Sequence, residues 1–424
     1  MTDPGALLDE RLADRLRVAA RRFGSPTFVT DLGTLDAACA SVRDAFPDPI
    51  IRQFSVKAND VPAIITAITA RGFGANVVSR GEWARARRAG VPNDRITLEG
   101  VGKTPADLRA AARAANEDTP VRWVAIESPE EAAALAGAVR QVGAPPQDVL
   151  YRLNPDVVPE TMAGLAVGAG AAKFGMTEIE IGAAITAGGG PDGALRPRGI
   201  HLHVGSQLGA IDAWREAVRK GLALTALWRG SIATFDTLDL GGGFPVLPVG
   251  EAAPTPERFA RELPALLDAI PADRRPARLA IEPGRVLVAR AGWLVARVLH
   301  VRERGGRQVI LDAGMTELIR PALYGARHPI VALTSLGRPL GPVGPGGPAG
   351  TFETVRVEGP ICESTDTLGS HDLPLLRRGD LLAIGDAGAY AASLASAYNG
   401  RPAPPQVLLA EDGTMTLGRA RARV

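Results

Sequence analysis

The side chain best suited to covalent chemistry is Lys57, in the segment FSVKAND. It directly follows an apolar run that predicts a strand. A lysine that is partly buried at the end of a strand can lose its proton and attack an aldehyde as a nucleophile. Most lysines are solvated surface charges, so this segment alone leaves both interpretations open.

A second cluster of polar side chains follows another predicted strand, in HLHVGSQ. Alternation along a strand sends His201 and His203 to the same face, and only one of them needs to be functional. Ser206 offers a hydroxyl where the chain turns toward a helix. A hydrogen-bonded histidine in the core is the alternative interpretation for either imidazole.

The segment LDLGGGFP places three glycines after a further strand, namely Gly241, Gly242 and Gly243. Backbone N–H groups without side chains beside them can surround an anion, and Ser206 lies only one predicted strand earlier. The two features together favour a phosphate-binding turn. A plain tight turn would also explain the glycines.

IEPGRVLVARAG places the acid Glu282 at a strand end, before a Pro-Gly turn that contains Gly284. A carboxylate facing a pyridine nitrogen would keep that nitrogen protonated, as an electron-accepting cofactor requires. Arg285 follows three residues later, so a structural ion pair between Glu282 and Arg285 is the alternative.

The last third of the chain supplies further candidates. In MTELIRPALYGARHP, the fork-shaped guanidinium of Arg320 suits a carboxylate and lies close to Tyr324. In VEGPICESTDTLG, the thiol of Cys362 could donate a proton and Glu363 could hold an ammonium group. Tyr390, in DAGAY, could reach a phosphate. A surface loop, an inert cysteine and a half-buried aromatic ring are the respective alternatives.

These groups need a scaffold that brings strand ends together, and residues 25–285 predict one. Short β-branched or apolar runs alternate there with longer amphipathic stretches, which is typical of parallel strands joined by helices. The predicted strands are 26–30, 51–56, 75–78, 96–98, 123–126, 149–153, 199–203, 237–240 and 279–281. Eight or nine strands fit a closed (β/α)8 TIM barrel, whose active sites gather at the carboxyl ends of the strands. Arg152 lies in one of these strands. A doubly wound open sheet is the rival, but no early G-x-G-x-x-G turn supports it.

The remainder of the chain predicts other units. Residues 1–24 form a helical pattern, and residues 286–424 contain strand-length apolar runs separated by Gly and Pro, which indicates a β domain of the barrel or sandwich kind. The run GPVGPGGPAG at 341–350 excludes a helix or central strand and predicts a surface loop.

Composition excludes several classes of partner. The net charge is only +2 over 424 residues and the arginines are not clustered with aromatic residues, so we expect no nucleic-acid binding. No run of about 18 apolar residues occurs, and the N-terminus does not resemble a signal peptide, so we expect a cytoplasmic protein that does not bind membranes. Five histidines without close cysteine or carboxylate spacing predict no metal site.

Taken in order, the segments resemble the fold-type III pyridoxal-phosphate-dependent decarboxylases, and among these the diaminopimelate decarboxylases are most similar. The matching segments run from about residue 25 to 408 and are FSVKAND, GFGANVVSRGEW, YRLNPDV, AKFGM, HLHVGSQ, LDLGGGFP, EPGRVLVARAG, DAGMTELIRPALYGARHP, GPICESTD, and GAY with SAYNGRP.

The resemblance implies an alanine-racemase-like barrel that binds pyridoxal 5'-phosphate, followed by a C-terminal β domain. The lysine that matches Lys57 holds the cofactor covalently, the histidine that matches His203 stacks on its ring, and the glutamate that matches Glu282 pairs with its nitrogen. The expected cofactor-binding residues are Lys57, Asn76, Arg152, His203, Ser206, Gly241, Gly242, Gly243, Glu282, Gly284, Arg285 and Tyr390.

The resemblance also implies a homodimer with shared active sites, in which Cys362 and Glu363 reach the site of the other subunit. Cys362 is then expected to be catalytic, with Lys57 and His203. The expected substrate-binding residues are Arg285, Arg320, Tyr324, Glu363 and Tyr390.

Glutamate after the cysteine is typical of enzymes that act at the D-configured carbon of meso-diaminopimelate, giving L-lysine and carbon dioxide. L-ornithine decarboxylases usually have aspartate there. A decarboxylase of another D- or L-amino acid, such as lysine, ornithine or arginine, is the alternative, and a non-catalytic homologue that binds the cofactor is a third possibility.

The sequence departs from the family pattern at several places. Asn76 stands where aspartate is usual, Arg80 where glycine is usual, and Gly325 follows Tyr324 where an acid is frequent. The strand-like lead-in common at the N-terminus is also missing. These departures indicate a diverged member of the family, and Asn76 removes a charge expected near Lys57.

Overall fold

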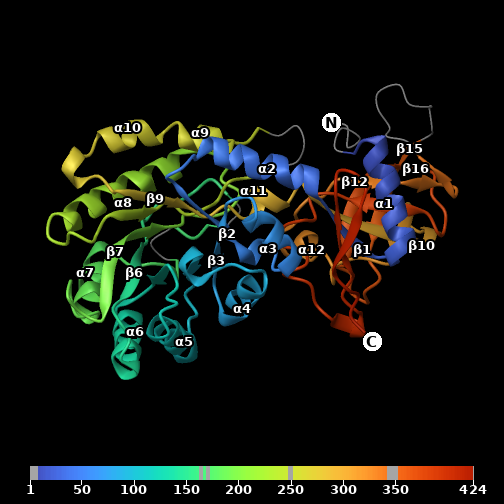
Figure 1. The fold of residues 1–424 in the computed structure, drawn as a ribbon. Coiled ribbons are helices and arrows are strands. Elements are labelled where there is room, and N and C mark those ends of the chain that lie inside the picture. The colour runs from blue at the N-terminus through green and yellow to red at the C-terminus, as the bar shows by residue number, and fades with distance from the viewer. Residues whose placement is uncertain (1–7, 162–165, 169–171, 247–251, 341–351, 424) are drawn as a thin grey trace.

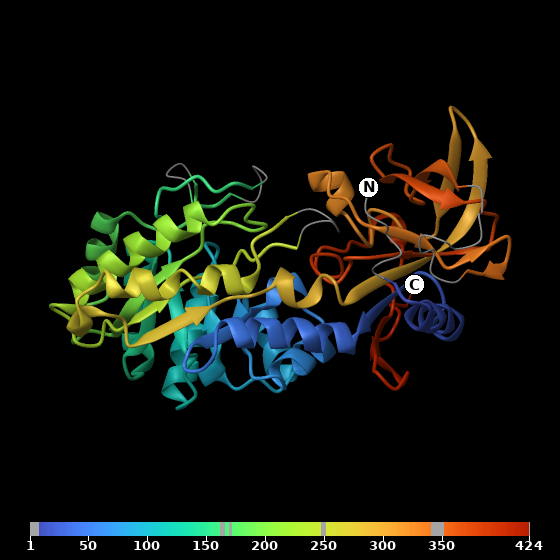
Figure 2. The same ribbon diagram turned by 90° about the horizontal axis from the view of Figure 1, so that it is seen from above.

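The protein consists of a barrel and a β-sheet unit that lie side by side, as a computed structural model shows (Figure 1). The structure describes residues 8–161, 166–168, 172–246, 252–340 and 352–423, and the predicted loop at 341–350 lies outside them. The first and last described residues, 8 and 423, lie at the sheet unit (Figure 2). Within the described part of the chain, no helix is both long enough and apolar enough to cross a membrane.

The barrel closes through parallel strands, eight of them within the described residues. In order they are β2 (Ile51–Ser55), β3 (Gly74–Val77), β4 (Ile96–Leu98), β5 (Trp123–Ile126), β6 (Gln147–Leu153), β7 (Leu195–Leu202), β8 (Thr237–Asp239) and β9 (Arg278–Ile281). The ring is complete because β9 pairs with β2, with Ile51 opposite Ala280. Strands buried on both faces read as continuous apolar runs, which is why they were visible in the sequence.

Helices cover the outside of the barrel: α2 (Leu32–Ala45), α3 (Pro62–Thr69), α4 (Arg80–Arg88), α5 (Pro105–Asn116), α6 (Pro129–Val142), α7 (Glu178–Ala187), α8 (Asp212–Arg229), α9 (Pro256–Ala260), α10 (Leu263–Asp268) and α11 (Arg285–Val288). Their beginnings follow local sequence signals. A capping box joins Thr104 and Asp107 at the start of α5, and Ser128 caps α6, whose first residue is Pro129. Side-chain caps satisfy N–H groups that the helix itself leaves without partners.

The second unit is an open nine-stranded sheet within the described residues, whose main path runs β16-β15-β11-β10-β1-β18-β19, with β17 and β12 added beside β10. Its strands are β1 (Thr27–Asp31), β10 (Gly292–Glu303), β11 (Arg307–Leu311), β12 (Ile330–Ala332), β15 (Phe352–Glu358), β16 (Thr367–Pro374), β17 (Leu381–Ile384), β18 (Gln406–Leu409) and β19 (Met415–Arg419). A small hairpin adds β13 (Thr334–Ser335) and β14 (Arg338–Pro339), and a short helix α12 (Arg320–Tyr324) follows β11.

The N-terminal helix α1 (Glu10–Phe23) packs on this sheet. Its buried face, which includes Leu16 and Ala20, contacts the cluster formed by Val29, Trp293 and Val295. Asp9 caps the helix by accepting the N–H of Leu12. The apolar stripe of α1 is thereby removed from water, which is the main source of stability for a helix of this length.

One predicted barrel strand belongs elsewhere. The run at 26–30 forms a strand, β1, but it pairs with β10 and β18 of the sheet and not with the barrel. The sequence could not show this, since a buried apolar run looks the same in either sheet. We therefore propose that the barrel unit begins at α2, and that α1 and β1 belong with residues from about 290 onward.

Candidate functional site

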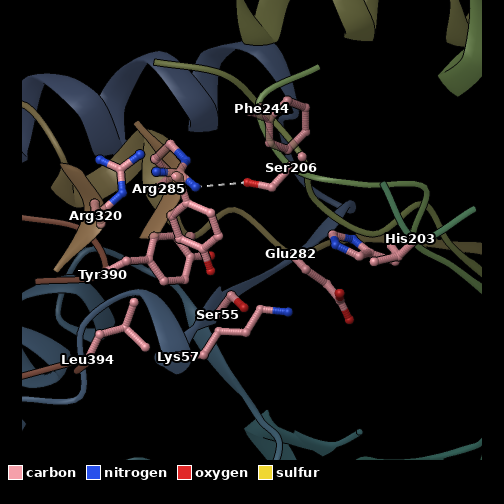
Figure 3. A pocket seen from close by; sticks show the side chains of 14 residues that line it. Ser55, Lys57, His203, Ser206, Phe244, Glu282, Arg285, Arg320, Tyr390 and Leu394 are labelled. Carbon is pink, nitrogen blue, oxygen red and sulfur yellow. Dashed lines mark hydrogen bonds between the residues drawn. The ribbon is translucent and has the colours of Figure 1, made fainter. Parts of the chain in front are cut away.

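A pocket opens at the carboxyl ends of the barrel strands, where the barrel meets α12 and the segment after β17. It has about 810 Å³ of space, part of it open to solvent. The barrel contributes Lys57, His203 and Glu282, and the sheet unit contributes Arg320 and Tyr390. In Figure 3 the amine of Lys57 lies between two ends of the pocket, with Arg285 and Arg320 at one end and Glu282 and His203 at the other.

Lys57 lies in a short 3-10 turn, Val56–Ala58, directly after β2. The sheet unit fixes this turn, because Ser393 donates to the carbonyl oxygen of Lys57 (2.9 Å) and the N–H of Tyr390 donates to that of Ala58 (2.8 Å). On the other side Gly284 packs so closely that a Cβ there would lie 3.2 Å from the Cβ of Ala58. The lysine backbone is thus held from both units while its side chain enters the pocket.

Two guanidinium groups form the cationic end. Arg285 is 6% exposed, donates through Nη2 to Oγ of Ser206 (3.1 Å) and lies 4.6 Å from the ring centroid of Tyr390. Arg320 is 8% exposed, and its Nη1 lies 3.1 Å from Nε2 of His328. Because Nδ1 of His328 donates to the carbonyl of Gly385, Nε2 is the accepting nitrogen and this histidine is neutral.

Burial works against the charge of both cations. It lowers the pKa of Arg285, and together with the nearby Arg285 it lowers the pKa of Arg320 to about 10. Burial also lowers the pKa of His328 to about 4. Within the described residues neither arginine has a carboxylate at ion-pair distance, although buried cations are normally paired. This end of the pocket therefore suits an anionic ligand.

The turn after β8 carries the three glycines, and of these Gly243 lines the pocket. The N–H of Gly242 donates to Nδ1 of His203 (3.3 Å). Gly241 and Gly243 have φ values of 68° and 103°, and a Cβ on Gly242 would lie 2.4 Å from the carbonyl oxygen of Glu282. Only glycine fits these positions of the turn without strain. Gly243 and Ser206 line the same pocket.

Burial lowers the pKa of His203 well below its ordinary value. With Nδ1 accepting from Gly242, the proton of the neutral ring is on Nε2. His201 does not line the pocket but lies beneath it, 1% exposed, with Nε2 3.4 Å from Oε2 of Glu282. Both histidines of HLHVGSQ therefore reach the site region, at different depths.

Glu282 is 5% exposed and ends β9. It accepts a hydrogen bond from Nδ2 of Asn76 (2.6 Å), and Asn76 also donates to Glu99. The ion pair between Glu282 and Arg285 that the sequence left open does not form, because Arg285 is bound to Ser206 instead.

Six of the expected residues do not line this pocket, namely Asn76, Arg152, Gly241, Gly242, Cys362 and Glu363. Arg152 is buried and paired with Glu127 (2.6 Å), inside the barrel. Cys362 and Glu363 lie on an exposed turn after β15, where Glu363 accepts from the hydroxyl of Tyr398 (2.8 Å). Within one chain, the structure therefore does not bring the thiol to Lys57.

Sequence reasoning missed two buried acids beside Glu282. Glu99 follows β4 and Asp239 ends β8, and they are 4% and 0% exposed. The same signal that marked Glu282, an acid at the carboxyl end of an apolar strand, is present in ITLEG and TLDLG. These positions could have been found by applying that rule to every strand.

The arrangement matches the needs of a ligand with an anionic group and a basic ring nitrogen. Gly243, Ser206 and Arg285 lie on one side, and the buried carboxylate of Glu282 lies on the other. Nε of Arg285, buried and without a partner within the described residues, is an open donor for such an anion. A primary amine between the two ends can bind an aldehyde.

Comparisons with known proteins agree with this geometry. Residues 32–289 match the family model described as the pyridoxal-binding domain of pyridoxal-dependent decarboxylases. The chain is 33% identical to the diaminopimelate decarboxylase of Aquifex aeolicus, over 96% of this chain and 91% of that one. It is 38% identical to the diaminopimelate decarboxylase of Actinosynnema pretiosum, over 92% and 84%. The crystal structure of Helicobacter pylori diaminopimelate decarboxylase complexed with L-lysine superimposes with a TM-score of 0.85 at 28% identity, covering 96% of both chains. The chain belongs to the family of pyridoxal-dependent decarboxylases, with pyridoxal phosphate as cofactor and an alanine-racemase-like fold.

Proposed function

We propose that this enzyme decarboxylates meso-diaminopimelate at its D-configured carbon and releases L-lysine. The observation that carries the proposal is the pair of buried guanidinium groups, Arg285 and Arg320, that face the pocket without a carboxylate partner within the described residues. Relatives named as diaminopimelate decarboxylases support it over most of the chain.

The cationic end discriminates between candidate substrates by charge. Diaminopimelate carries a carboxylate as well as an ammonium group at the end that does not react, whereas lysine and ornithine carry only the ammonium group. An unpaired buried guanidinium disfavours a distal ammonium and favours a distal carboxylate. Ser206 and the glycine turn engage the cofactor phosphate together with Arg285, which leaves Arg320 as the principal carboxylate ligand.

The residues present fit the cofactor. We infer that Lys57 binds its aldehyde carbon, that His203 lies against its ring, and that Glu282 faces its ring nitrogen. The phosphate would be held by Ser206 and by the backbone N–H groups of Gly243, Gly284 and Arg285, with Tyr390 beside them. The N–H groups of Gly241 and Gly242 already donate to Asp239 and His203, so these two glycines would shape the turn. Arg152 is paired with Glu127 deeper in the barrel and would act on the cofactor site only through the residues that lie between them.

Pyridoxal phosphate supplies an electron-accepting ring for the electrons released when carbon dioxide leaves. Lys57 would hold the cofactor through its Nζ atom, and its amine would be free in the pocket while the substrate is bound. Glu282 holds a proton at the ring nitrogen by presenting a negative charge to it. Arg320 orients the substrate through its distal carboxylate, so that the reacting carboxyl group points away from Lys57.

The carbon that loses carbon dioxide must then receive a proton, and we propose that Cys362 of the partner subunit donates it from Sγ. Cys362 and Glu363 are exposed on the turn after β15. A residue that contributes to the active site of another subunit must be exposed in the isolated chain. Asp366 shapes this turn by accepting the N–H groups of Met315 (2.6 Å) and Ile361 (2.7 Å). We therefore propose a homodimer, with Glu363 of the partner subunit receiving the distal ammonium group of the substrate.

An exposed catalytic thiol must stay reduced, and this supports our proposal of a cytoplasmic location, where thiols are kept free.

The test is carbon dioxide release from the purified holoenzyme with meso-diaminopimelate, D- and L-lysine, D- and L-ornithine and arginine. We expect release from diaminopimelate alone. Release from lysine, ornithine or arginine and none from diaminopimelate would contradict the proposed substrate and leave the family assignment intact.

A further inference from the structure

Five polar side chains meet beneath the pocket, in the interior of the barrel. Each comes from a different strand or strand end, and none is more than 5% exposed. They are Asn76 of β3, Glu99 after β4, His201 of β7, Asp239 of β8 and Glu282 after β9. Three of the five are carboxylic acids, which is an unusual charge load for the inside of a protein.

The amide of Asn76 is the link between two of these acids. Its Nδ2 donates both to Oε1 of Glu99 and to Oε1 of Glu282, the second bond being 2.6 Å long. His201 approaches the same two side chains, with Nε2 3.5 Å from Glu99 and 3.4 Å from Glu282. Since an amide NH2 has two protons to donate, one asparagine can hold both carboxyl groups in place at once.

The groups in this cluster cannot all be charged. Burial, and then the neighbouring Glu282, raises the pKa of Glu99 to about 8. The same two causes raise the pKa of Asp239 well above its ordinary value, and burial lowers the pKa of His201 to about 4. His201 on β7 and Lys57 on the turn after β2 act on Glu99 in the opposite direction, but burial outweighs them. At neutral pH Glu99 therefore holds a proton and His201 is neutral, while the raised pKa of Asp239 favours its protonated form.

We propose that Asn76 and Glu99 act as one positioning unit for Glu282: Glu99 keeps a proton, Asn76 bridges the two glutamates, and Glu282 is the one of the two that presents a negative charge to the cofactor ring. This rests on the proposed place of Glu282 opposite the ring nitrogen. Asn76 stands where aspartate is usual in the family pattern, and an aspartate there would add a further acid to a site that already holds Glu99.

A metal ion is the rival explanation, because ligand atoms of Glu99, His201 and Glu282 lie within 4.8 Å of one another. The amide nitrogen of Asn76 already bonds to an oxygen of each glutamate, so it occupies the place between them that a cation would need. The group that joins the two glutamates is therefore the side-chain amide of Asn76.

The test compares N76D, E99Q and the double variant N76D/E99Q by titrating each full-length apoenzyme with pyridoxal phosphate and following the absorbance of the bound cofactor. N76D adds an acid and is expected to weaken cofactor affinity about tenfold or more, the equivalent of one pKa unit. The double variant restores the original number of acids and is expected to return to within about threefold of the wild type. E131Q is the control, because Glu131 is a half-buried acid paired with Lys103 (2.8 Å) outside the cluster, and its affinity should not change.

A second measurement does not depend on N76D folding well. An acid with a raised pKa binds a proton in the folded but not the unfolded chain, so stability falls as pH rises from about 4.5 toward 8. In E99Q this contribution is absent, so the thermal midpoint of the apoenzyme should fall less between pH 5 and 8 than in the wild type.

Two results would overturn the inference: a double variant that binds the cofactor no better than N76D, or an E99Q midpoint with the wild-type pH dependence. A stoichiometric rise of the wild-type midpoint with zinc that E99Q abolishes would assign the cluster to a metal instead. These measurements use no substrate, so their outcome does not depend on the proposed function. If the double variant regains its cofactor affinity but the wild type does not turn over diaminopimelate, only the proposed substrate is refuted.

Discussion

At the scale of single residues, burial decides which groups in the pocket keep a charge. His203 and His328 are neutral because burial lowers the pKa of each, while Arg285 and Arg320 remain cations in spite of burial. A buried cation without a neighbouring acid destabilises the folded protein. Such a cation is expected where an anionic ligand supplies the opposite charge. We therefore expect substrate selection to depend on Arg320 more than on Lys57.

Replacement of Arg320 by methionine removes the cation and keeps much of the side-chain volume. We expect KM for meso-diaminopimelate to rise about 10- to 100-fold, as for the loss of a charge-assisted hydrogen bond. Steady-state kinetics check this, with R304M as control, since Arg304 is exposed on a turn of the sheet unit. An unchanged KM in R320M would contradict the role of Arg320 in carboxylate binding.

Replacement of Cys362 by alanine removes the proposed proton donor. Because general acid catalysis is worth about 10²- to 10⁴-fold in rate, turnover should fall within that range while the absorbance of the bound cofactor stays the same. Turnover equal to that of the wild type would exclude Cys362 as the donor.

At the scale of elements, the sequence predicted which residues lie at the carboxyl ends of the barrel strands. Lys57, His203, the three glycines and Glu282 all follow strands that the apolar runs located, so their meeting at one rim followed from barrel closure. The assignment of β1 to the sheet could not be predicted, since partner choice depends on contacts far apart in sequence. The bridging role of Asn76 also could not be predicted from the sequence. It depends on the hydrogen bonds that Asn76 donates to Glu99 and Glu282, and on which of these acids is protonated.

The turn after β8 allows a prediction at this scale. In G242A the new Cβ would lie 2.4 Å from the carbonyl oxygen of Glu282, so the turn must shift. We expect the free energy of unfolding to fall by about 1–3 kcal/mol and cofactor affinity to fall with it. The matched control is G137A, in helix α6, where a Cβ meets nothing within 4 Å and alanine favours the helix. A G242A variant as stable as the wild type would show that the turn has room.

At the scale of the whole molecule, the sheet unit completes a pocket that the barrel begins. Tyr390 and Ser393 fix the turn that carries Lys57, and α12 supplies Arg320. The turn that carries Cys362 is the part of the proposed machinery left outside this pocket, and a second subunit is our explanation. Shared sites make activity a property of the dimer.

Complementation between two inactive variants tests the shared site. In a mixture of K57A and C362A, each mixed dimer would hold one site with both Lys57 and Cys362 intact. After dissociation and reassembly in equal amounts, we expect about a quarter of the wild-type activity, the statistical share of intact sites. Activity no higher than the mean of the two variants alone would contradict a site that combines Lys57 of one subunit with Cys362 of the other.

The configuration of the product tests the central claim most directly. The holoenzyme is incubated with meso-diaminopimelate, and carbon dioxide and each enantiomer of lysine are measured in the same sample. We predict equal amounts of carbon dioxide and L-lysine, because the D-configured carbon reacts and the L-configured end is held by Arg320. Formation of D-lysine, or no lysine from an enzyme that carries its cofactor, would contradict the account.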